Sequence, residues 1–191
     1  MVAEPNLTYT EAEYLGLERD SEVRHEYYAG EIFAMVGASE AHNLIVTSTV
    51  FSLYGQLRAN PCRVYSNDMR VRVAATGLYT YPDLIVVCGE SRFADDTFET
   101  LANPTAIIEV LPDSTERYDR GKKFQHYRAL ASLREYLLIA QDAAHIEHFV
   151  REDADSWRLT EADGMAATIH LPAIDCTLPL AKVYEEVMLA D

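Results

Sequence analysis

Two short apolar segments restrict the fold of this chain more than any other feature. Residues 82–88, PDLIVVC, form a continuous apolar run, and residues 103–111, NPTAIIEVL, open at a proline and continue through aliphatic residues. Strands that are buried on both faces of a sheet have such continuous runs. We therefore expect both segments to be strands near the middle of a sheet.

Glu109 is the one residue of the second segment that does not suit a buried strand. A carboxylate among large aliphatic side chains is costly in free energy unless it is paired or bound to a ligand. Because alternate residues of a strand share a face, we expect Glu109 on the same face as Ile107 and Leu111. The segment therefore predicts a partner for a carboxylate on that face.

The neighbouring segments have the periodicities of helices and further strands. Ser39 suits the N-cap of a helix that ends near Asn60. From residue 39 to residue 141 the expected order is helix, strand, strand, strand, helix, strand, with bounds near 39–60, 62–74, 82–88, 105–111, 117–132 and 135–142. This order predicts an α/β (α+β) fold with a mixed central sheet flanked by helices.

Smaller elements are expected on both sides of this core. A capping box at Thr10–Glu13 predicts a short helix, and a hairpin is expected to turn at Ala29-Gly30. Towards the C-terminus, residues 145–162 predict a solvated hairpin extension, and residues 180–190 predict a terminal helix.

Length and composition fit one globular domain. The chain has 191 residues, of which 49% are hydrophobic and 25% charged, so we expect a single domain at 1–191 with its core at about 39–141 and an extension at about 142–191. No apolar run approaches the roughly 18 residues that cross a membrane, and no signal peptide is recognisable. The three cysteines, odd in number and far apart, argue against a disulfide framework and a cysteine zinc site, and they fit a reducing cytoplasm.

The charge distribution limits how nucleic acid could bind. A net charge of −15 argues against indiscriminate binding, which usually requires a basic surface. One window, ERYDRGKKFQHYR, is strongly basic. It offers Arg117, Arg120, Lys122 and Arg128 as candidate contacts to nucleic acid.

Asp83 and Glu109 are the candidate metal ligands. If their two strands pair, the carboxylates converge at one end of the sheet and form an oxygen-only site that suits Mg²⁺ or Mn²⁺. The alternative is that Asp83 caps the start of its strand and Glu109 pairs with an arginine, for which Arg70 and Arg72 are the first candidates.

Several blocks of this sequence together resemble one known family. Asp83 after a proline, followed by Glu109 in an apolar strand, is similar to the PD-(D/E)xK nuclease superfamily. The blocks YPDLIVVCGE, NPTAIIEVL, STERYDRGKKFQHYR and LREYLLI, preceded by HEYYAGEI and ASEAHN, resemble the Uma-type family of restriction-endonuclease-like bacterial proteins over roughly residues 8–190. The resemblance implies a restriction-endonuclease-like core and Mg²⁺-dependent hydrolysis of phosphodiester bonds, with Asp83 and Glu109 holding the ion.

The superfamily's usual lysine, two residues after the acid, is absent. Leu111 occupies that position, and the family pattern places the lysine at Lys123 instead. In a helix, Lys123 shares a stripe with Tyr127 and Leu130, whereas Lys122 is turned roughly 100° away. We expect Lys123 to replace the strand lysine; the alternative is a solvated side chain.

Three further residues are weaker candidates. His42 and Glu26 match positions of the family pattern and are expected near the metal site. The alternatives are a core histidine at position 42 and a salt bridge from Glu26 to Arg24 or Arg70. Asp68 is expected to be a turn or bulge residue.

The sequence thus favours a metal-dependent DNA endonuclease, and by analogy a homodimer, because cleavage of a duplex requires two sites. The alternative is a catalytically silent module on a nuclease scaffold that binds nucleic acid or protein. Leu111 and the net charge favour this alternative.

Overall fold

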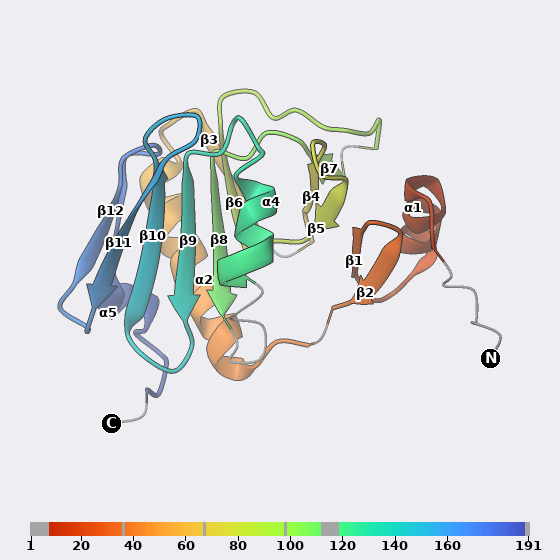
Figure 1. Cartoon of the computed structure of the whole chain (residues 1–191). Helices are drawn as coiled ribbons and strands as arrows, with labels where there is room; N and C mark the ends of the chain where they lie inside the picture. The colour runs from red at the N-terminus through yellow and green to blue at the C-terminus, as the bar shows by residue number, and fades with distance from the viewer. Residues whose placement is uncertain (1–7, 36, 67, 98, 112–118, 190–191) are drawn as a thin grey trace.

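The protein is built from two packed β-sheets, each with a helix on its outer face, and a further short helix lies on the side of the larger sheet that meets the smaller one (Figure 1). The computed structural model describes residues 8–35, 37–66, 68–97, 99–111 and 119–189. The larger sheet has six strands in the order β11-β10-β9-β8-β6-β3, and its parallel pair is β8 with β9. The strands are β3 (Cys62–Ser66), β6 (Leu84–Cys88), β8 (Ala106–Leu111), β9 (Glu135–Ala140), β10 (His145–Arg151) and β11 (Trp157–Asp163). The expected mixed α/β fold is therefore confirmed, with both apolar segments as interior strands.

The smaller sheet carries the N-terminal hairpin. Its order is β2-β1-β5-β4-β7. The bounds are β1 (His25–Tyr28), β2 (Glu31–Ala34), β4 (Arg70–Val73), β5 (Leu78–Thr80) and β7 (Thr100–Leu101). Positive φ angles at Ala29 and Gly30 form the turn between β1 and β2, where the sequence predicts it.

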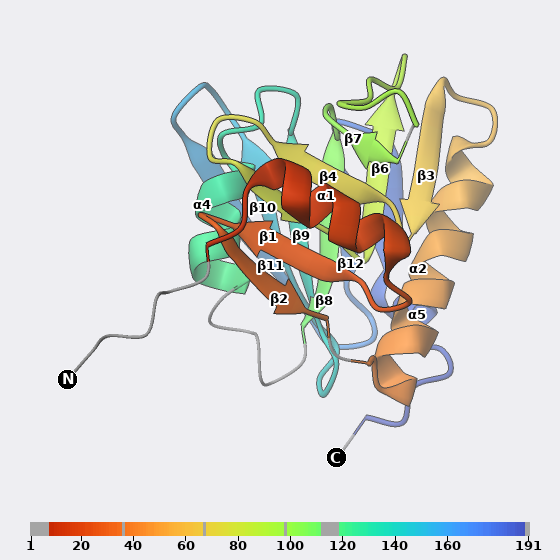
Figure 2. The same cartoon turned by 90° about the vertical axis from the view of Figure 1, so that its right-hand side faces the viewer.

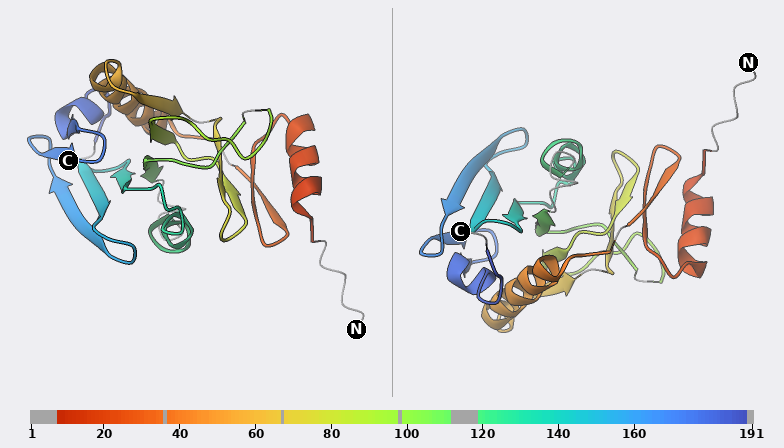
Figure 3. Two further views of the ribbon diagram at one scale, coloured as in Figure 1. Left: turned by 90° about the horizontal axis from the view of Figure 1, so that it is seen from above. Right: turned by 90° about the horizontal axis from the view of Figure 1, so that it is seen from below.

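Helix α1 (Glu11–Asp20) covers the outer face of the smaller sheet, as Figures 2 and 3 show. It begins with the predicted capping box between Thr10 and Glu13. Its Tyr14 is fully buried and stacks on Tyr27 of β1, with ring centroids 5.0 Å apart. The smaller sheet therefore has α1 on one face and turns its other face towards the larger sheet (Figure 3).

Opposite faces of the larger sheet are covered by different helices. Helix α2 (Glu40–Leu57) shares one apolar cluster with Ile108 and Val110 of β8. The π-helical turn η1 (Asp119–Lys123) continues into α4 (Phe124–Tyr127), which packs with Ile107 and Leu111. This alternation along β8 places Glu109 on the α4 face. Among the described helices, none is long and apolar enough to cross a membrane.

The sequence predicts one strand from residue 62 to residue 74, but the structure divides this segment into two strands. It forms β3 in the larger sheet and β4 in the smaller one, and Asp68 donates its backbone N–H to the carbonyl of Ser66 between them. Both halves alternate apolar and polar residues, so periodicity alone does not mark the crossing between sheets. Strands β5 and β7 are not predicted; both are very short.

The C-terminal part is also more integrated than expected. β10 and β11 extend the larger sheet, and a separate hairpin of β12 (Thr168–Leu171) and β13 (Cys176–Pro179) buries apolar residues in the same cluster as α2. The expectation of a solvated hairpin is therefore wrong for β10, whose Ile146 and His148 are buried. The terminal helix, α5, spans Leu180–Val183, shorter than predicted.

Cys62 and Cys88 form a disulfide, which contradicts the expectation from cysteine spacing. They are 26 residues apart in the sequence, but the antiparallel register of β3 and β6 places them directly opposite one another, with Cα atoms 4.0 Å apart. Spacing along the chain therefore misled the prediction, because strand register decides which cysteines meet. Cys176 is buried and free.

Candidate metal and catalytic site

Strand register brings Asp83 and Glu109 together. β6 and β8 are antiparallel, with Leu84 opposite Ile108, so Asp83 at the start of β6 lies next to Glu109. The backbone N–H of Asp83 lies 3.5 Å from Glu109 Oε2, and Val110 donates its N–H to Asp83 Oδ2 at 2.7 Å. The two acids therefore converge where one interior strand begins and its neighbour continues.

Lys123 reaches the same position from η1. Its Nζ lies 3.0 Å from Glu109 Oε1 and 3.1 Å from Glu26 Oε1, and the residue is 7% exposed. Lys122 is exposed, and Leu111 lies in the apolar cluster around α4. The alternative of a solvated Lys123 therefore does not hold.

Glu26 comes from the smaller sheet. β1 and β5 pair with Tyr27 opposite Tyr79, and the Thr80 hydroxyl donates to Glu26 Oε1. Glu26 thus belongs to the face that meets the larger sheet, and both sheets contribute acids to one cluster.

The arginines considered as alternative partners have other contacts. Arg70 donates to Thr100 and Tyr81 at 2.9 and 3.2 Å, and Arg72 pairs with Glu11 at 2.9 Å. A separate exposed pair joins Arg24 to Asp68 across 3.4 Å, which fits the expected turn position of Asp68. Glu109 and Glu26 instead both contact Lys123.

His42 contacts Asp83 from the first turn of α2. Its Nε2 lies 3.0 Å from Asp83 Oδ1, and both side chains are less than a fifth exposed. Ser39 caps the helix by accepting the His42 backbone N–H, which fixes where this turn begins. His42 Nδ1 is buried and has no hydrogen-bond partner among the residues that the structure describes. His42 is therefore part of the acidic cluster and not a simple core histidine.

Tyr127 is the site residue that the sequence analysis does not single out. Its hydroxyl donates to Glu109 Oε1 at 2.7 Å and lies 3.5 Å from the Thr80 hydroxyl. Burial, and next the negative charge of Glu109, raise the pKa of Tyr127 well above its ordinary value. Tyr127 therefore stays protonated and donates. Its position four residues after Lys123, on the same side of a helix, is the sequence signal that could have identified Tyr127 as a site residue.

The basic window has fewer side chains free to contact nucleic acid than its charge indicates. Arg120 donates through Nε to Glu147 Oε1 at 2.7 Å, and Arg128 donates to the carbonyl of Asp155 at 3.2 Å. Lys122 is exposed, and Arg117 lies outside the described residues. Two of the predicted contacts are therefore already engaged within the protein.

A second group of possible ligands lies on β10 and β11. One ligand atom from each of His145, Glu147 and Glu161 lies within 4.8 Å of the others. Glu147 faces Glu161 directly in the antiparallel register. Arg120 and Asp163 already contact Glu147 and His145, respectively. Sequence reasoning missed this group because its members meet only through the pairing of β10 with β11.

The donor chemistry of the Asp83–Glu109 site fits a hard divalent cation. Two carboxylates from neighbouring strands supply oxygen ligands of the kind that Mg²⁺ and Mn²⁺ prefer. Outer contacts orient both acids: His42 and the Val110 N–H hold Asp83, and Lys123 and Tyr127 contact the Oε1 atom of Glu109. Ligands held in this way are typical of preorganised metal sites.

Comparisons with known proteins agree with this architecture. A family model described as "Putative restriction endonuclease", Uma2, matches residues 11–181. An uncharacterized protein of Synechocystis sp., sll1609, is 34% identical over 169 residues, covering 88% of this chain and 96% of its own. A second from the same organism, slr1290, is 33% identical over 145 residues, covering 76% and 75%. A solved structure from Anabaena variabilis, described as a putative nuclease belonging to DUF820, shares the fold with a TM-score of 0.75 at 17% identity, covering 91% of this chain and 96% of the other.

Proposed function

This chain belongs to the Uma2 family of putative restriction endonucleases, and we propose that it is a metal-dependent endonuclease that hydrolyses phosphodiester bonds of DNA. The observation that carries the proposal is a cluster built from four further elements. His42 from α2 contacts Asp83, Lys123 from η1 and Tyr127 from α4 contact Glu109, and Glu26 from β1 joins them through Lys123. These elements are far apart in the sequence. Structural stability alone does not require such a concentration of charge at one point.

In this proposal Asp83 and Glu109 hold Mg²⁺ or Mn²⁺. When bound, the ion supplies Lewis-acid polarisation of the scissile phosphate and favours deprotonation of the attacking water. Lys123, beside Glu109, is placed to stabilise the negative charge that develops on the phosphate. It would thereby replace the lysine missing at Leu111.

His42 and Tyr127 are proposed to position the two acids. His42 restrains the Asp83 carboxylate through Oδ1, and Tyr127 restrains Glu109 through Oε1. Glu26 shares Lys123 with Glu109 and so fixes the ammonium group between two carboxylates. Each of these contacts would limit rotation of a group that has to be aligned before reaction.

A catalytically silent binding module is the alternative that the net charge favours. Incubating plasmid and single-stranded DNA with the protein in Mg²⁺ and in Mn²⁺ separates the two functions. We expect cleavage by the wild type, none by Asp83→Asn, and wild-type cleavage by the surface control Glu90→Gln. Binding of DNA without cleavage in either metal would support the silent module. The proposed homodimer would be tested by light scattering with and without DNA.

A further inference from the structure

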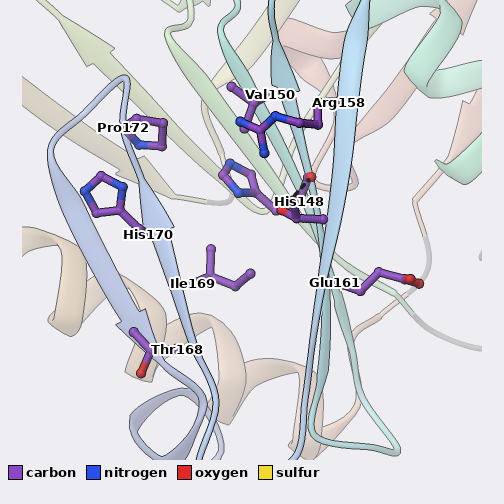
Figure 4. Close-up of a pocket in the computed structure, with 9 residues that line it drawn as sticks. His148, Val150, Arg158, Glu161, Thr168, Ile169, His170 and Pro172 are labelled. Atoms are coloured by element: carbon purple, nitrogen blue, oxygen red, sulfur yellow. Dashed lines mark hydrogen bonds between the residues drawn. The ribbon is translucent and has the colours of Figure 1, made fainter.

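A second candidate site lies in the C-terminal half of the protein, apart from Asp83 and Glu109. A cavity of about 330 Å³ opens between β10 and β11 on one side and β12 on the other (Figure 4). None of its lining residues belongs to the Asp83–Glu109 site. Its volume lies at the lower end of the range for small-molecule pockets.

His148 and Glu135 make the inner part of this region unusual. Glu135 on β9 is fully buried, and His148, which lines the cavity, is 2% exposed. His148 Nε2 lies 3.5 Å from Glu135 Oε1, which also accepts the Ala173 N–H at 3.2 Å. Among the described residues, neither His148 Nε2 nor Glu135 Oε2 has a hydrogen-bond partner. The two side chains face one another across 3.5 Å and both are buried, so Glu135 lies behind His148 and restrains its imidazole from the interior side.

Basic side chains surround the opening. Figure 4 shows Arg158, His148 and His170 around the same space, whereas Glu161 points away from it. Arg158 donates through Nε to Glu152 Oε1 at 3.0 Å, which leaves its two Nη groups to bind a second acceptor. The cavity therefore presents one guanidinium and two imidazoles, each of which can donate a hydrogen bond.

The other lining residues suit the body of an organic ligand. Thr160 and Thr168 add hydroxyl groups, and Val150, Ile169 and Pro172 add apolar surface. The lining is more polar than apolar, which suits a charged ligand, and the three apolar residues offer contact to its carbon skeleton.

We propose that this cavity binds a small organic molecule that carries an oxyanion, a phosphate or a carboxylate, between Arg158 and His148. Glu135 lies behind His148 and would orient the imidazole towards the bound anion, as carboxylates commonly do for functional histidines. Three carboxylates lie near the cavity: Glu152 pairs with Nε of Arg158, Glu135 lies behind His148, and Glu161 points away from the space (Figure 4). Charges farther away than about 8 Å are largely screened at physiological salt. The inference does not depend on the proposed nuclease activity.

Calorimetric titration tests this site with three probes: 5′-AMP, inorganic phosphate and citrate, each with chelator present. Adenosine serves as the uncharged control. We expect saturable binding of at least one organic anion, more tightly than inorganic phosphate, and at least a tenfold loss of affinity in Arg158→Gln. Arg158 is half exposed, so this substitution should leave the fold intact. His148→Gln should weaken binding in the same direction.

Two controls assign the binding to this cavity. Arg58→Gln removes an exposed arginine elsewhere, and Asp83→Asn alters the other site; both should bind like the wild type. If none of the probes binds at millimolar concentration, or if Arg158→Gln binds as tightly as the wild type, the proposal is overturned. A preference of AMP over citrate, or the reverse, would identify the oxyanion as phosphate or carboxylate.

Discussion

Glu109 shows how a carboxylate can occupy an interior strand. It is 4% exposed, yet Lys123 and Tyr127 both contact its Oε1 atom within 3.0 Å. A buried ion pair rarely adds net stability, because desolvation costs about as much as the attraction returns. We therefore attribute this arrangement to the proposed site and not to the needs of the fold.

The two adjacent lysines should respond differently to substitution. Lys123→Ala should slow DNA cleavage by at least ~10²-fold, the low end for loss of a positioned catalytic group, because it removes the cation next to Glu109. Lys122 is exposed, so Lys122→Ala should leave the cleavage rate at saturating DNA unchanged and reduce the salt dependence of binding.

Cleavage rates at saturating DNA and binding at several salt concentrations check both parts. Circular dichroism of each variant shows whether the fold is retained, which matters because Lys123 lies between two acids. Equal and small effects of the two substitutions would exclude a special role for Lys123.

At the scale of elements, the sequence predicts best where one strand or helix determines its own pattern. The continuous apolar runs identify β6 and β8, and alternation along β8 correctly places Glu109 on the face of Ile107. The sequence predicts contacts poorly where the position of a second element determines which residues meet. Tyr127 acquires its partner only because α4 packs on β8, and Cys62 meets Cys88 only through strand register. The short strands β5 and β7 have too few residues to show a period.

The pairing of β6 with β8 leads to a prediction about metal and stability. An ion that binds only the folded protein should add about 2.7 kcal/mol at ~100 times its dissociation constant. For a domain of this size, that corresponds to a rise in Tm of roughly 5–10 °C. Thermal melts of the wild type at neutral pH, with chelator and with millimolar Mn²⁺, should show this rise.

Glu109→Gln should abolish most of the metal response. Without metal we do not expect it to stabilise the protein, because it would leave Lys123 with one carboxylate fewer. Glu90→Gln, at an exposed position, should respond to Mn²⁺ like the wild type. A wild-type melting curve that Mn²⁺ does not shift would argue strongly for the silent module.

At the scale of the whole molecule, the candidate site exists only where two sheets and two helices meet. Glu26 belongs to the smaller sheet, whereas Glu109 lies on β8 of the larger sheet and Asp83 immediately precedes β6. Such a junction cannot be predicted from periodicity. The pattern of a segment indicates which of its residues are buried, but not which other segment packs against them. The family comparison confirms the resemblance to the family. That resemblance pointed to the same residues, because they match positions of the family's sequence pattern.

Buried tyrosines are a second property of the whole molecule, and they determine its behaviour in alkali. Burial is the main cause that raises the pKa of Tyr79 and of Tyr81 to about 12 and that of Tyr127 well above its ordinary value. Tyr14 and Tyr184 shift in the same direction. In the unfolded chain these groups titrate near pH 10.

Because the folded pKa values lie above the unfolded ones, the folded protein holds these protons more tightly than the unfolded chain. The resulting stability is fully present below about pH 10 and is lost as the pH rises above it. Urea unfolding between about pH 8 and pH 11 should therefore show a free energy of unfolding that falls steeply above pH 10. The free energy of unfolding of Tyr127→Phe should fall less steeply. That of Tyr54→Phe, at a 61% exposed position, should follow the wild type. If the ultraviolet absorbance of phenolate rises for most tyrosines before the circular dichroism changes, the tyrosines titrate in the folded state, and burial does not protect them.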